Sequence, residues 1–373
     1  MNSLDGMEDA IAARSSITWI DGEKGELRYR GYAIGDLAER CSFEEVAYLL
    51  WHGDLPDQSS LSALRETLRE YRVRSADLLE LVDRAPASAH PLDLLRYVLS
   101  WDAMKNPMAW HSTDEANMEK AMQMTAWFPV VVAAYHRRRQ GETAVAPSRE
   151  GDTAQSFLEM LKGRKPDTLA VKTLDTSLIL HADHELNAST FAARVTIATQ
   201  SNLHAAIASA LGTLTGPRHG GASERVIRML ETIGDASRVA DYVRGELAAK
   251  QRIMGFGHRV YRTVDPRSRH LKVMASRMLA GTERQPWIAI LDELQRVMAN
   301  EKRLYPNVDL YAAIVNHELG VDPAFYTSMF AMSRIVGWTA HTMEQLDGRM
   351  IRPAAEYVGE PPRSMLAGAA SVR

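Results

Sequence analysis

Histidine, aspartate and glycine gather in four short polar segments in the second half of an otherwise apolar, helix-rich sequence. The segments are residues 181–184 (His-Ala-Asp-His), 216–221 (Gly-Pro-Arg-His-Gly-Gly), 255–259 (Gly-Phe-Gly-His-Arg) and 305–309 (Tyr-Pro-Asn-Val-Asp). A carboxylate can take a proton from carbon, while imidazoles donate hydrogen bonds to the negative charge that develops on an oxygen. The four segments therefore suit carbon-acid chemistry.

His219 lies directly before a predicted helix that begins near residues 220–222. A helix N-terminus disfavours a protonated ring and lowers its pKa, and a neutral imidazole is a suitable hydrogen-bond donor to a forming enolate. Gly220 and Gly221 would also let a ligand approach the backbone. The alternative, which the residue alone does not exclude, is a histidine that caps a turn.

The segment around His258 has two glycines and is followed by a cluster of arginines. It does not predict a Rossmann site, because Val260 occupies the place of the third glycine and no strand clearly precedes it. The arginines are Arg259, Arg262, Arg267 and Arg269. They suggest anion recognition through bidentate pairing, and their alternative role is a solvated basic face.

Asp309 precedes an apolar run, so as an isolated acid it is better explained as a helix N-cap than as a general base. His181 and His184 are three residues apart, which would place them on one helical face. No cysteine pair and no His-Glu-x-x-His spacing accompanies them. We therefore expect ligand-binding or structural histidines here and no metal site.

Arg334 lies in the middle of a predicted helix, among apolar residues. A guanidinium in such a position needs a counter-charge or an anionic ligand, because an unpaired buried charge is costly. Glu318 and Glu344 are distant candidates along the sequence. A substrate carboxylate is therefore a candidate partner, with a salt bridge in the core as the alternative, and Arg352 is a weaker example of the same kind.

The elements that must hold these segments are predicted to be helices, with a small β hairpin at residues 17–29. Ser42 and Glu45 form a capping box, and Gly53 is a stop signal for the helix that follows. Helices are expected over residues 43–51, 61–71, 126–138, 175–180, 189–211, 222–233, 240–250, 268–279, 286–300 and 323–345. The fold class is therefore mostly α, and the segment after Tyr357 is expected to be an arm or a frayed end.

Length and composition exclude several classes of protein. A chain of 373 residues favours two domains, and a net charge of −3 argues against nucleic acid binding. Cys41 is the single cysteine, which excludes an internal disulfide and fits a reducing compartment. Neither a signal peptide nor an apolar run long enough for a membrane span is visible, so we expect a cytoplasmic protein.

Taken together and in this order, the segments resemble the citrate synthase family in its bacterial and archaeal form, from about residue 16 to residue 357. The further matching segments are residues 27–32, 43–50, 187–190, 260–267 and 333–337. The resemblance implies the family's mostly helical fold. It also implies a large domain of residues 1–218 and 315–373, and an inserted small domain of residues 219–314 that closes over the substrates.

The reaction implied by this resemblance condenses acetyl-CoA, as co-substrate, with oxaloacetate and hydrolyses citryl-CoA, without a permanently bound cofactor. A close alternative is a 2-methylcitrate synthase that uses propionyl-CoA, because one methylene changes binding in an apolar pocket by only ~1–3 kcal/mol. Two further alternatives belong to other classes: a non-catalytic regulator that binds CoA or a dicarboxylate, and a helical metal-binding or scaffold protein.

The resemblance implies a role for each site residue. Asp309 would take the methyl proton, His219 would donate a hydrogen bond to the thioester enol, and His258 would polarise the ketone and protonate the new alkoxide. The implied oxaloacetate ligands are His184, Arg267, Arg334 and Arg352. The implied CoA-binding loop is Arg252, Ile253, Met254, Gly255 and Phe256. Arg352 would come from the partner subunit of an obligate homodimer, and the sequence does not determine whether dimers assemble further.

The sequence departs from the family pattern beside two of these residues. Arg218 and Ser223 replace the Leu and Asn that are common around the implied catalytic histidine, and Ala354 replaces a common Arg. A cation at position 218 would alter the contacts to CoA or the electrostatics at His219. The residues after Gly359 do not resemble the usual C-terminal arm. No departure removes an implied catalytic residue, and the acyl preference and any allosteric regulation are not determined by the sequence.

Overall fold

A small antiparallel sheet opens the described part of the chain, which in this computed structural model comprises residues 11–220 and 223–362. Its strands are β1 (Thr18–Asp21), β2 (Glu26–Tyr29) and β3 (Tyr32–Ala33), hydrogen-bonded in the order β1-β2-β3. The predicted hairpin is confirmed, with Thr18 opposite Tyr29. The third strand adds to the prediction: Arg30 and Gly31 have φ values of 48° and 90°, as a two-residue hairpin turn requires.

Helices make up most of the remaining described fold. The first ten are α1 (Ile34–Arg40), α2 (Phe43–His52), α3 (Gln58–Arg74), α4 (Leu79–Arg84), α5 (Pro91–Lys105), α6 (Asp114–Arg139), α7 (Thr153–Lys162), α8 (Thr168–His181), α9 (Ala188–Ile197) and α10 (Leu203–Leu214). They are followed by α11 (Ser223–Ile233), α12 (Val239–Ala248), α13 (Pro266–Leu279), α14 (Trp287–Lys302), α15 (Val308–Glu318) and α16 (Tyr326–Leu346). Short 3-10 turns are η1 (Ser75–Leu78), η2 (Ala236–Arg238) and η3 (Pro323–Phe325). The mostly α fold class is confirmed.

Local capping signals explain where several helices begin and end. Ser42 Oγ accepts from Glu45 N at 3.4 Å and Glu45 Oε2 accepts from Ser42 N at 2.7 Å, so the predicted capping box of α2 is confirmed. Gly53 ends that helix with φ +93°. The single long helix predicted over residues 189–211 is wrong. The left-handed backbone of Gln200 interrupts it, and the side chain of the residue before Leu203 caps α10.

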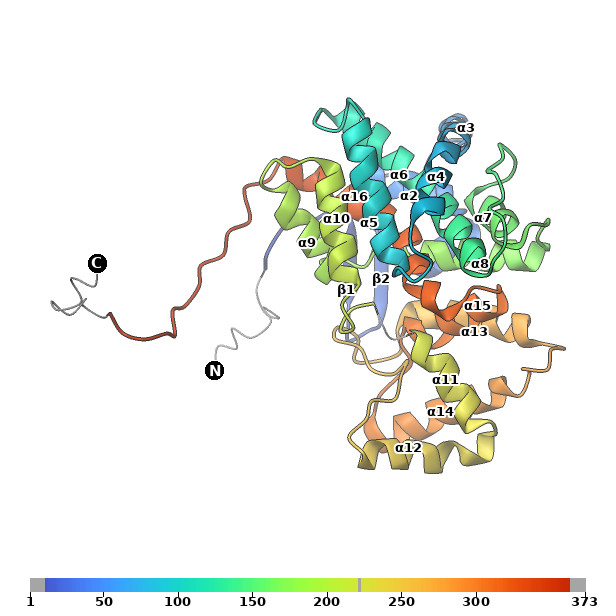
Figure 1. Ribbon diagram of the computed structural model, residues 1–373. Coiled ribbons are helices and arrows are strands. Elements are labelled where there is room, and N and C mark those ends of the chain that lie inside the picture. Colours follow the sequence, from blue (N-terminus) through green and yellow to red (C-terminus); the bar gives the residue numbers. More distant parts are fainter. Residues whose placement is uncertain (1–10, 221–222, 363–373) are drawn as a thin grey trace, which may run out of the picture.

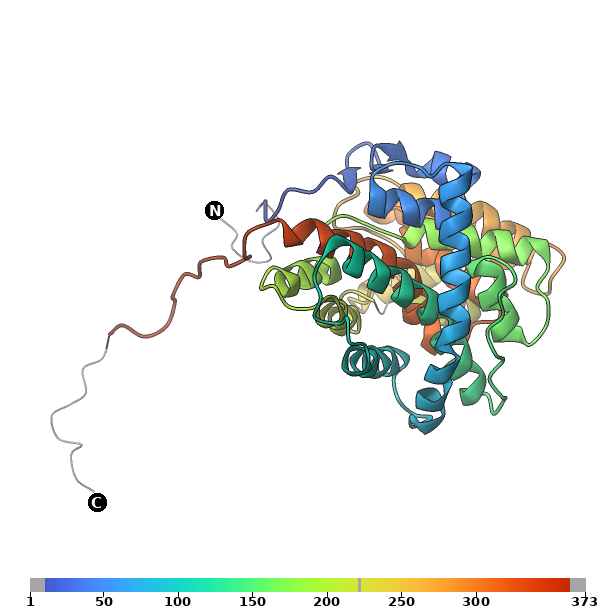
Figure 2. The ribbon, with the colours of Figure 1, turned by 90° about the horizontal axis from the view of Figure 1, so that it is seen from above.

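The helices α6 and α16 form the centre of the larger group of helices. α16 packs against α2, α6, α8, α9 and α10, and Figure 2 shows it in red among them. α6 begins earlier than predicted because Thr113 Oγ1 accepts from Ala116 N and caps it. The middle of α16 is buried throughout, including Trp338 and Arg334. The predicted position of Arg334 within a buried helix is therefore confirmed.

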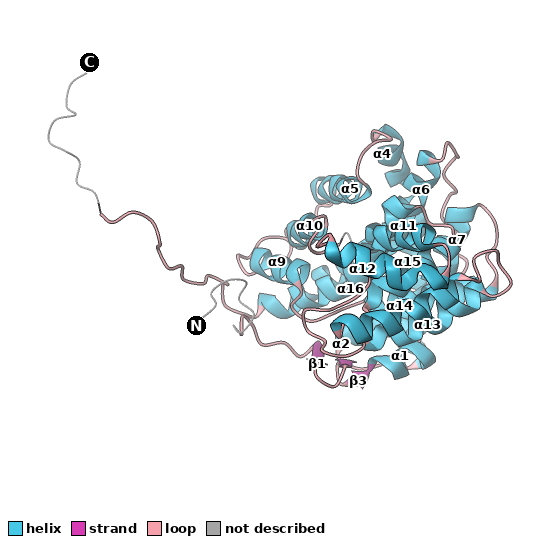
Figure 3. Cartoon of the chain, turned by 90° about the horizontal axis from the view of Figure 1, so that it is seen from below, coloured by secondary structure: helices cyan, strands magenta, loops and turns pink. Residues whose placement is uncertain are grey.

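Helices α11 to α15 lie together at the opposite end of the molecule (Figure 1). α13 and α11 pack against α15, and α12 packs against α14. α13 and α15 also contact α8, so this second group rests against the first. Figure 3 shows the small sheet at the edge of the molecule beside α1. Among the described residues, no helix is both long enough and apolar enough to cross a bilayer.

Candidate active site

His184 lies in a buried turn that follows α8. Because α8 ends at His181, the expectation that His181 and His184 share a helical face is wrong. The His184 ring is buried, and its Nε2 lies 3.1 Å from the hydroxyl of Tyr261. Burial, together with the Arg267 guanidinium, lowers the pKa of His184 well below its ordinary value. The ring is therefore neutral near pH 7.

His181, by contrast, has the surroundings of a structural histidine. Its Nδ1 lies 2.7 Å from Ser177 O, one turn earlier in α8. The ring packs edge-on against Phe330, with 5.3 Å between the ring centroids. Burial and the charge of Arg267 lower its pKa to about 3. A neutral ring that donates to its own helix needs no ligand.

The loops at residues 255–258 and 305–309 are joined by hydrogen bonds. Asn307 N donates to Gly255 O at 2.9 Å, and Asn307 Nδ2 donates to Gly257 O at 2.9 Å. Gly255 has φ +79°, and a Cβ there would lie 2.7 Å from a side chain of α15. Only glycine permits this close approach. The pairing places the first loop beside the first turn of α15.

His258 belongs to this first loop, and backbone groups fix its ring. Its Nδ1 accepts hydrogen bonds from Val260 N at 3.0 Å and from Tyr261 N at 3.2 Å. The proton of the neutral ring is therefore on Nε2. Burial and the charge of Arg267 lower the pKa of His258 to about 4. Its ring centroid lies 5.2 Å from that of His184, so the two imidazoles adjoin.

Asp309 lies in the first turn of α15 and is half-buried. The helix cap is Asn307, whose Oδ1 accepts from Asp309 N at 3.0 Å. The interpretation of Asp309 as the N-cap is therefore wrong. Its carboxylate is not required for capping, and the positive end of the helix stabilises a negative charge there.

His219 contacts Ser189 in the first turn of α9. Ser189 N donates to His219 Nε2 at 3.3 Å, and Ser189 Oγ lies 2.8 Å from the same nitrogen, which leaves the proton of the neutral ring on Nδ1. Trp338 Nε1 holds the serine by donating to its Oγ at 3.2 Å. The pKa of His219 is lowered to about 4, but the main cause is burial, followed by the charge of Arg334. The predicted helix start near residues 220–222 includes residues 221 and 222, which lie outside the described residues.

Arg267 and Arg334 bring positive charge to this cluster, and both are buried. Arg267 donates to Asp265 through Nε at 3.0 Å and through Nη2 at 2.7 Å. Burial acts to lower the pKa of Arg267, but Asp265 raises it above its ordinary value. Arg334 Nε donates to His181 O at 2.7 Å, whereas its buried Nη2 has no hydrogen-bond partner among the described residues. Burial lowers the pKa of Arg334 to about 10. The unsatisfied donor is a position for an anionic ligand.

The sequence leaves open whether Arg334 forms a salt bridge in the core and whether the arginines after His258 bind an anion. The positions of the other charged side chains answer both questions. Glu344 pairs with Arg194 at 2.6 Å and Glu318 pairs with Arg284 at 2.6 Å, so neither glutamate is the partner of Arg334. In the run of arginines that follows His258, Arg259, Arg262 and Arg269 are exposed. They form the solvated face that was the alternative to anion binding, and only the buried member of that run joins the cluster.

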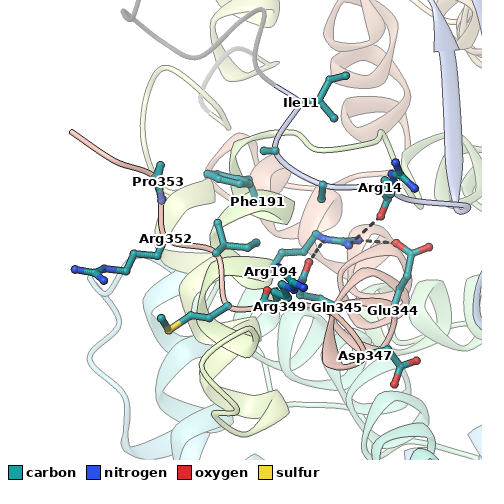
Figure 4. Close-up of a pocket in the computed structure, with 15 residues that line it drawn as sticks. Ile11, Arg14, Phe191, Arg194, Glu344, Gln345, Asp347, Arg349, Arg352 and Pro353 are labelled. Atoms are coloured by element: carbon teal, nitrogen blue, oxygen red, sulfur yellow. Dashed lines mark hydrogen bonds and ion pairs between the residues drawn. The ribbon is translucent and has the colours of Figure 1, made fainter. Parts of the chain in front are cut away.

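Arg352 is exposed on the segment that leaves the helical body after α16. A pocket of about 560 Å³ lies between this segment and residues 11–14, and the Arg352 side chain points outward from it (Figure 4). The single chain therefore does not bring Arg352 to the cluster around Arg334.

The predicted CoA loop lies next to the start of α15. Phe256 forms an isolated β bridge with Pro306, and Arg252 is exposed. The buried members of the loop are Ile253 and Gly255, and the half-buried members are Met254 and Phe256. The loop therefore combines an anchored backbone with one exposed cation.

Several partners of the cluster give no signal of their own in the sequence. Tyr261 and Trp338 are aromatic residues that any helical core would contain. Asp183 lies between His181 and His184, and an isolated aspartate there has no recognisable pattern of its own. Ser189 lies in the first turn of α9, which Asn187 caps. An asparagine before a helical segment is a recognisable N-cap, so it could have indicated that Ser189 lies at a helix start. Among the described residues, no group of histidine, cysteine, aspartate or glutamate is arranged to hold a metal ion.

The helical fold thus places neutral imidazoles beside buried arginines, an arrangement whose chemistry suits a small anionic carbonyl compound. The family model described as citrate synthase, C-terminal domain, matches residues 6–354. Citrate synthase 2 of Bacillus subtilis is 42% identical over 361 residues, with 96% of each chain covered. The 2-methylcitrate synthase of Mycobacterium tuberculosis is 39% identical over 359 residues, with 96% of this chain and 91% of that protein covered.

Solved structures agree with the sequence comparisons. The ternary complex of citrate synthase from Thermoplasma acidophilum with carboxymethyl coenzyme A and oxaloacetate matches with a TM-score of 0.90 and 31% identity, covering 98% of each chain. The chain belongs to the citrate synthase family. Members of this family are transferases that use acetyl-CoA as co-substrate and need no permanent cofactor.

Proposed function

We propose that this protein is a citrate synthase, which condenses acetyl-CoA with oxaloacetate through an enol and hydrolyses citryl-CoA to citrate and CoA. The observation that carries the proposal is the cluster of neutral imidazoles beside Arg334, whose buried Nη2 lacks a partner in the described residues. Neutral rings donate hydrogen bonds near pH 7 without changing charge. A buried guanidinium calls for an anion, and oxaloacetate supplies two carboxylates.

The proposal assigns a role in the reaction to each of three catalytic residues. Asp309 is the general base that takes a proton from the methyl group of acetyl-CoA. His219 donates its Nδ1 proton as a hydrogen bond to the enol oxygen. His258 donates from Nε2 to the oxaloacetate ketone and then protonates the alkoxide that forms as the enol carbon bonds to the ketone carbon. Water finally hydrolyses the thioester.

We place the base, His219, His258, Arg267 and the CoA loop on a small domain, residues 219–314. His184, Arg334 and Arg352 then belong to a large domain of residues 1–218 and 315–373. The hydrogen bonds between the two joined loops support this division, because both loops would move as one unit. Arg267 and Arg334 then belong to different domains. A dicarboxylate between them favours closure, which excludes water during enolisation.

A homodimer is supported by exposed apolar residues on α5 and in the turn after it. Tyr97, Trp101 and Met104 follow one another at helical spacing on α5, and Met108 and Trp110 lie in the turn. A cluster of exposed apolar side chains is typical of a subunit interface. Arg352, which points away from its own chain, would then complete the oxaloacetate site of the partner. Whether dimers assemble further is a separate question for sedimentation measurements.

Mixing two inactive variants tests the shared site. Asp309→Asn removes the base, and Arg352→Gln removes the arginine that we expect from the partner subunit, so each homodimer should be nearly inactive. In a mixed dimer, one site keeps both native residues. Random assembly of co-expressed subunits should therefore return about one quarter of the wild-type rate of CoA release. A mixture no more active than its separate components contradicts the sharing of Arg352.

The acyl specificity is tested by comparing two thioesters. We expect purified wild-type protein to release CoA thiol from acetyl-CoA with a higher kcat/KM than from propionyl-CoA, in both reactions only when oxaloacetate is present. The named relatives include both citrate synthases and 2-methylcitrate synthases, and one methylene is worth only ~1–3 kcal/mol. A higher kcat/KM for propionyl-CoA would replace the proposal by its alternative, 2-methylcitrate synthase.

We also propose that the protein works in the cytoplasm. The support is the single cysteine, Cys41, which is half-buried and forms no disulfide in the described chain.

A further inference from the structure

A chain of polar side chains connects the His184 turn with the segment that carries Arg352. Its members are Thr18, Asp183, His341, Arg194, Glu344 and Gln345, and we name this set the buried polar chain. Only Glu344 among them is more than slightly exposed. None of the six is assigned a step in the proposed reaction.

Donors and acceptors in the buried polar chain follow one direction. Arg194 Nη1, which can only donate, lies 3.0 Å from His341 Nδ1, so this nitrogen accepts and the ring proton is on Nε2. His341 Nε2 then donates to Asp183 Oδ2 at 3.2 Å. The same oxygen accepts from Thr18 Oγ1 at 2.5 Å. His341 thus bridges a buried cation and a buried carboxylate.

Asp183 fixes the turn that presents His184. Its carboxylate is fully buried, and Oδ2 also accepts from Glu185 N at 3.1 Å, on the far side of His184. The hydroxyl of Tyr29 accepts from Asp183 N at 3.2 Å and donates to Asp183 O at 2.8 Å. The backbone on both sides of His184 is therefore held by this one residue.

The same carboxylate faces the helix that carries Arg334. Gly337 lies one turn after Arg334 on α16, and a Cβ there would come within 2.4 Å of Asp183 Oδ1. Gly337 N also donates to the backbone of the turn, at Ala182 O, at 3.1 Å. Burial alone would raise the pKa of Asp183, but His341 and Arg334 hold it below its ordinary value. The turn and the helix are thus joined both by contact and by charge.

The other end of the buried polar chain holds the base of the C-terminal segment. Arg194 donates to Glu344 Oε2 at 2.6 Å and to Gln345 Oε1 at 3.0 Å (Figure 4). Gln345 Nε2 donates to Arg349 O at 3.1 Å, in the segment that leads to Arg352. One set of hydrogen bonds within the chain therefore reaches from the turn that carries His184 to Arg349, in the segment that leads to Arg352.

We propose that Asp183 and His341 are positioning residues for oxaloacetate binding: they hold the His184 turn against α16, so that His184 and Arg334 keep the spacing that a dicarboxylate requires. Neither residue touches the substrate. The inference rests on the proposed function, because it concerns the same oxaloacetate site.

Calorimetric titration of the full-length protein with oxaloacetate tests the inference with three variants. His341→Leu removes both hydrogen bonds and is expected to weaken binding about tenfold or more, as when a buried polar group loses its partner. His341→Gln should stay within about threefold of wild type, because its amide can accept from Arg194 and donate to Asp183. Thr342→Val is the matched control: Thr342 is fully buried, its hydroxyl donates only within α16, and binding should not change.

Thr18→Val supplies a second, nearly isosteric removal of a partner of Asp183, and it too should weaken oxaloacetate binding. The KM for acetyl-CoA should stay unchanged in every variant, whereas a purely structural role would lower Tm without separating the two substrates. If folded His341→Leu and Thr18→Val bind oxaloacetate like the wild type, the inference is overturned. Failure of the wild type itself to bind oxaloacetate would instead overturn the proposed function, and the inference with it.

Discussion

Replacing Asp309 with asparagine is expected to lower kcat about a thousandfold while oxaloacetate binding stays close to that of the wild type. A positioned general base contributes roughly 10²–10⁴-fold to a rate, and the amide that replaces it cannot take a proton. The fold should persist, because Asn307 rather than Asp309 caps α15. The measurement is steady-state CoA release, combined with calorimetric titration of oxaloacetate.

Asp322→Asn is the matched control for this loss. Asp322 is also an acid at the start of a helical turn, where it accepts from Ala324 N at 2.9 Å and caps η3. An asparagine retains this capping oxygen, so kcat should not change. If Asp309→Asn kept a near-normal kcat, the assignment of the base would be wrong.

Replacing Arg334 with leucine is expected to raise the KM and the Kd for oxaloacetate by about a hundredfold, as when a charge-assisted hydrogen bond to a buried ligand is lost. Arg334 Nη2 has no partner among the described residues, and the guanidinium lies 4.5 Å above the Phe330 ring. Burial of this charge costs more than its attraction to Asp183 returns, since the pKa of Arg334 is lowered to about 10. The leucine variant should therefore melt at the same temperature or higher.

The combination of weaker binding and unchanged or higher Tm separates a ligand role from a structural one. The Kd of Arg334→Lys for oxaloacetate should lie between those of the wild type and Arg334→Leu, because an ammonium keeps the charge but not the planar guanidinium. Oxaloacetate binding by Arg334→Leu within twofold of wild type would show that another cation receives the substrate carboxylate.

The sequence was sufficient for those features that depend on local rules. The capping box of Ser42 and Glu45, the stop at Gly53 and the hairpin before them depend on neighbouring residues only. Arg334 could likewise be predicted as a buried cation, because apolar residues surround its position on the helix and indicate that the helix is buried on that side. The order of the four motif segments along the chain is specific to one family, and this order predicted that their histidines belong to one site.

Features that depend on distant contacts could not be predicted in this way. Whether His181 and His184 share a helix depends on where α8 ends, and its C-cap residue, Ala182, accepts a hydrogen bond from the distant Gly337 N of α16. The low pKa of His219 arises from burial more than from a helix terminus, and burial is a property of the whole fold. The pairing of Asp265 with Arg267 was equally invisible, because nothing in a sequence separates a buried pair from a solvated one.

The most direct test of the central claim is the release of CoA thiol by the purified wild-type protein, followed with a thiol reagent. We expect release from acetyl-CoA when oxaloacetate is added, no release without it, and one citrate formed for each thiol. A folded protein that releases no thiol from acetyl-CoA or propionyl-CoA in the presence of oxaloacetate would contradict the account and favour a non-catalytic regulator that binds CoA or a dicarboxylate.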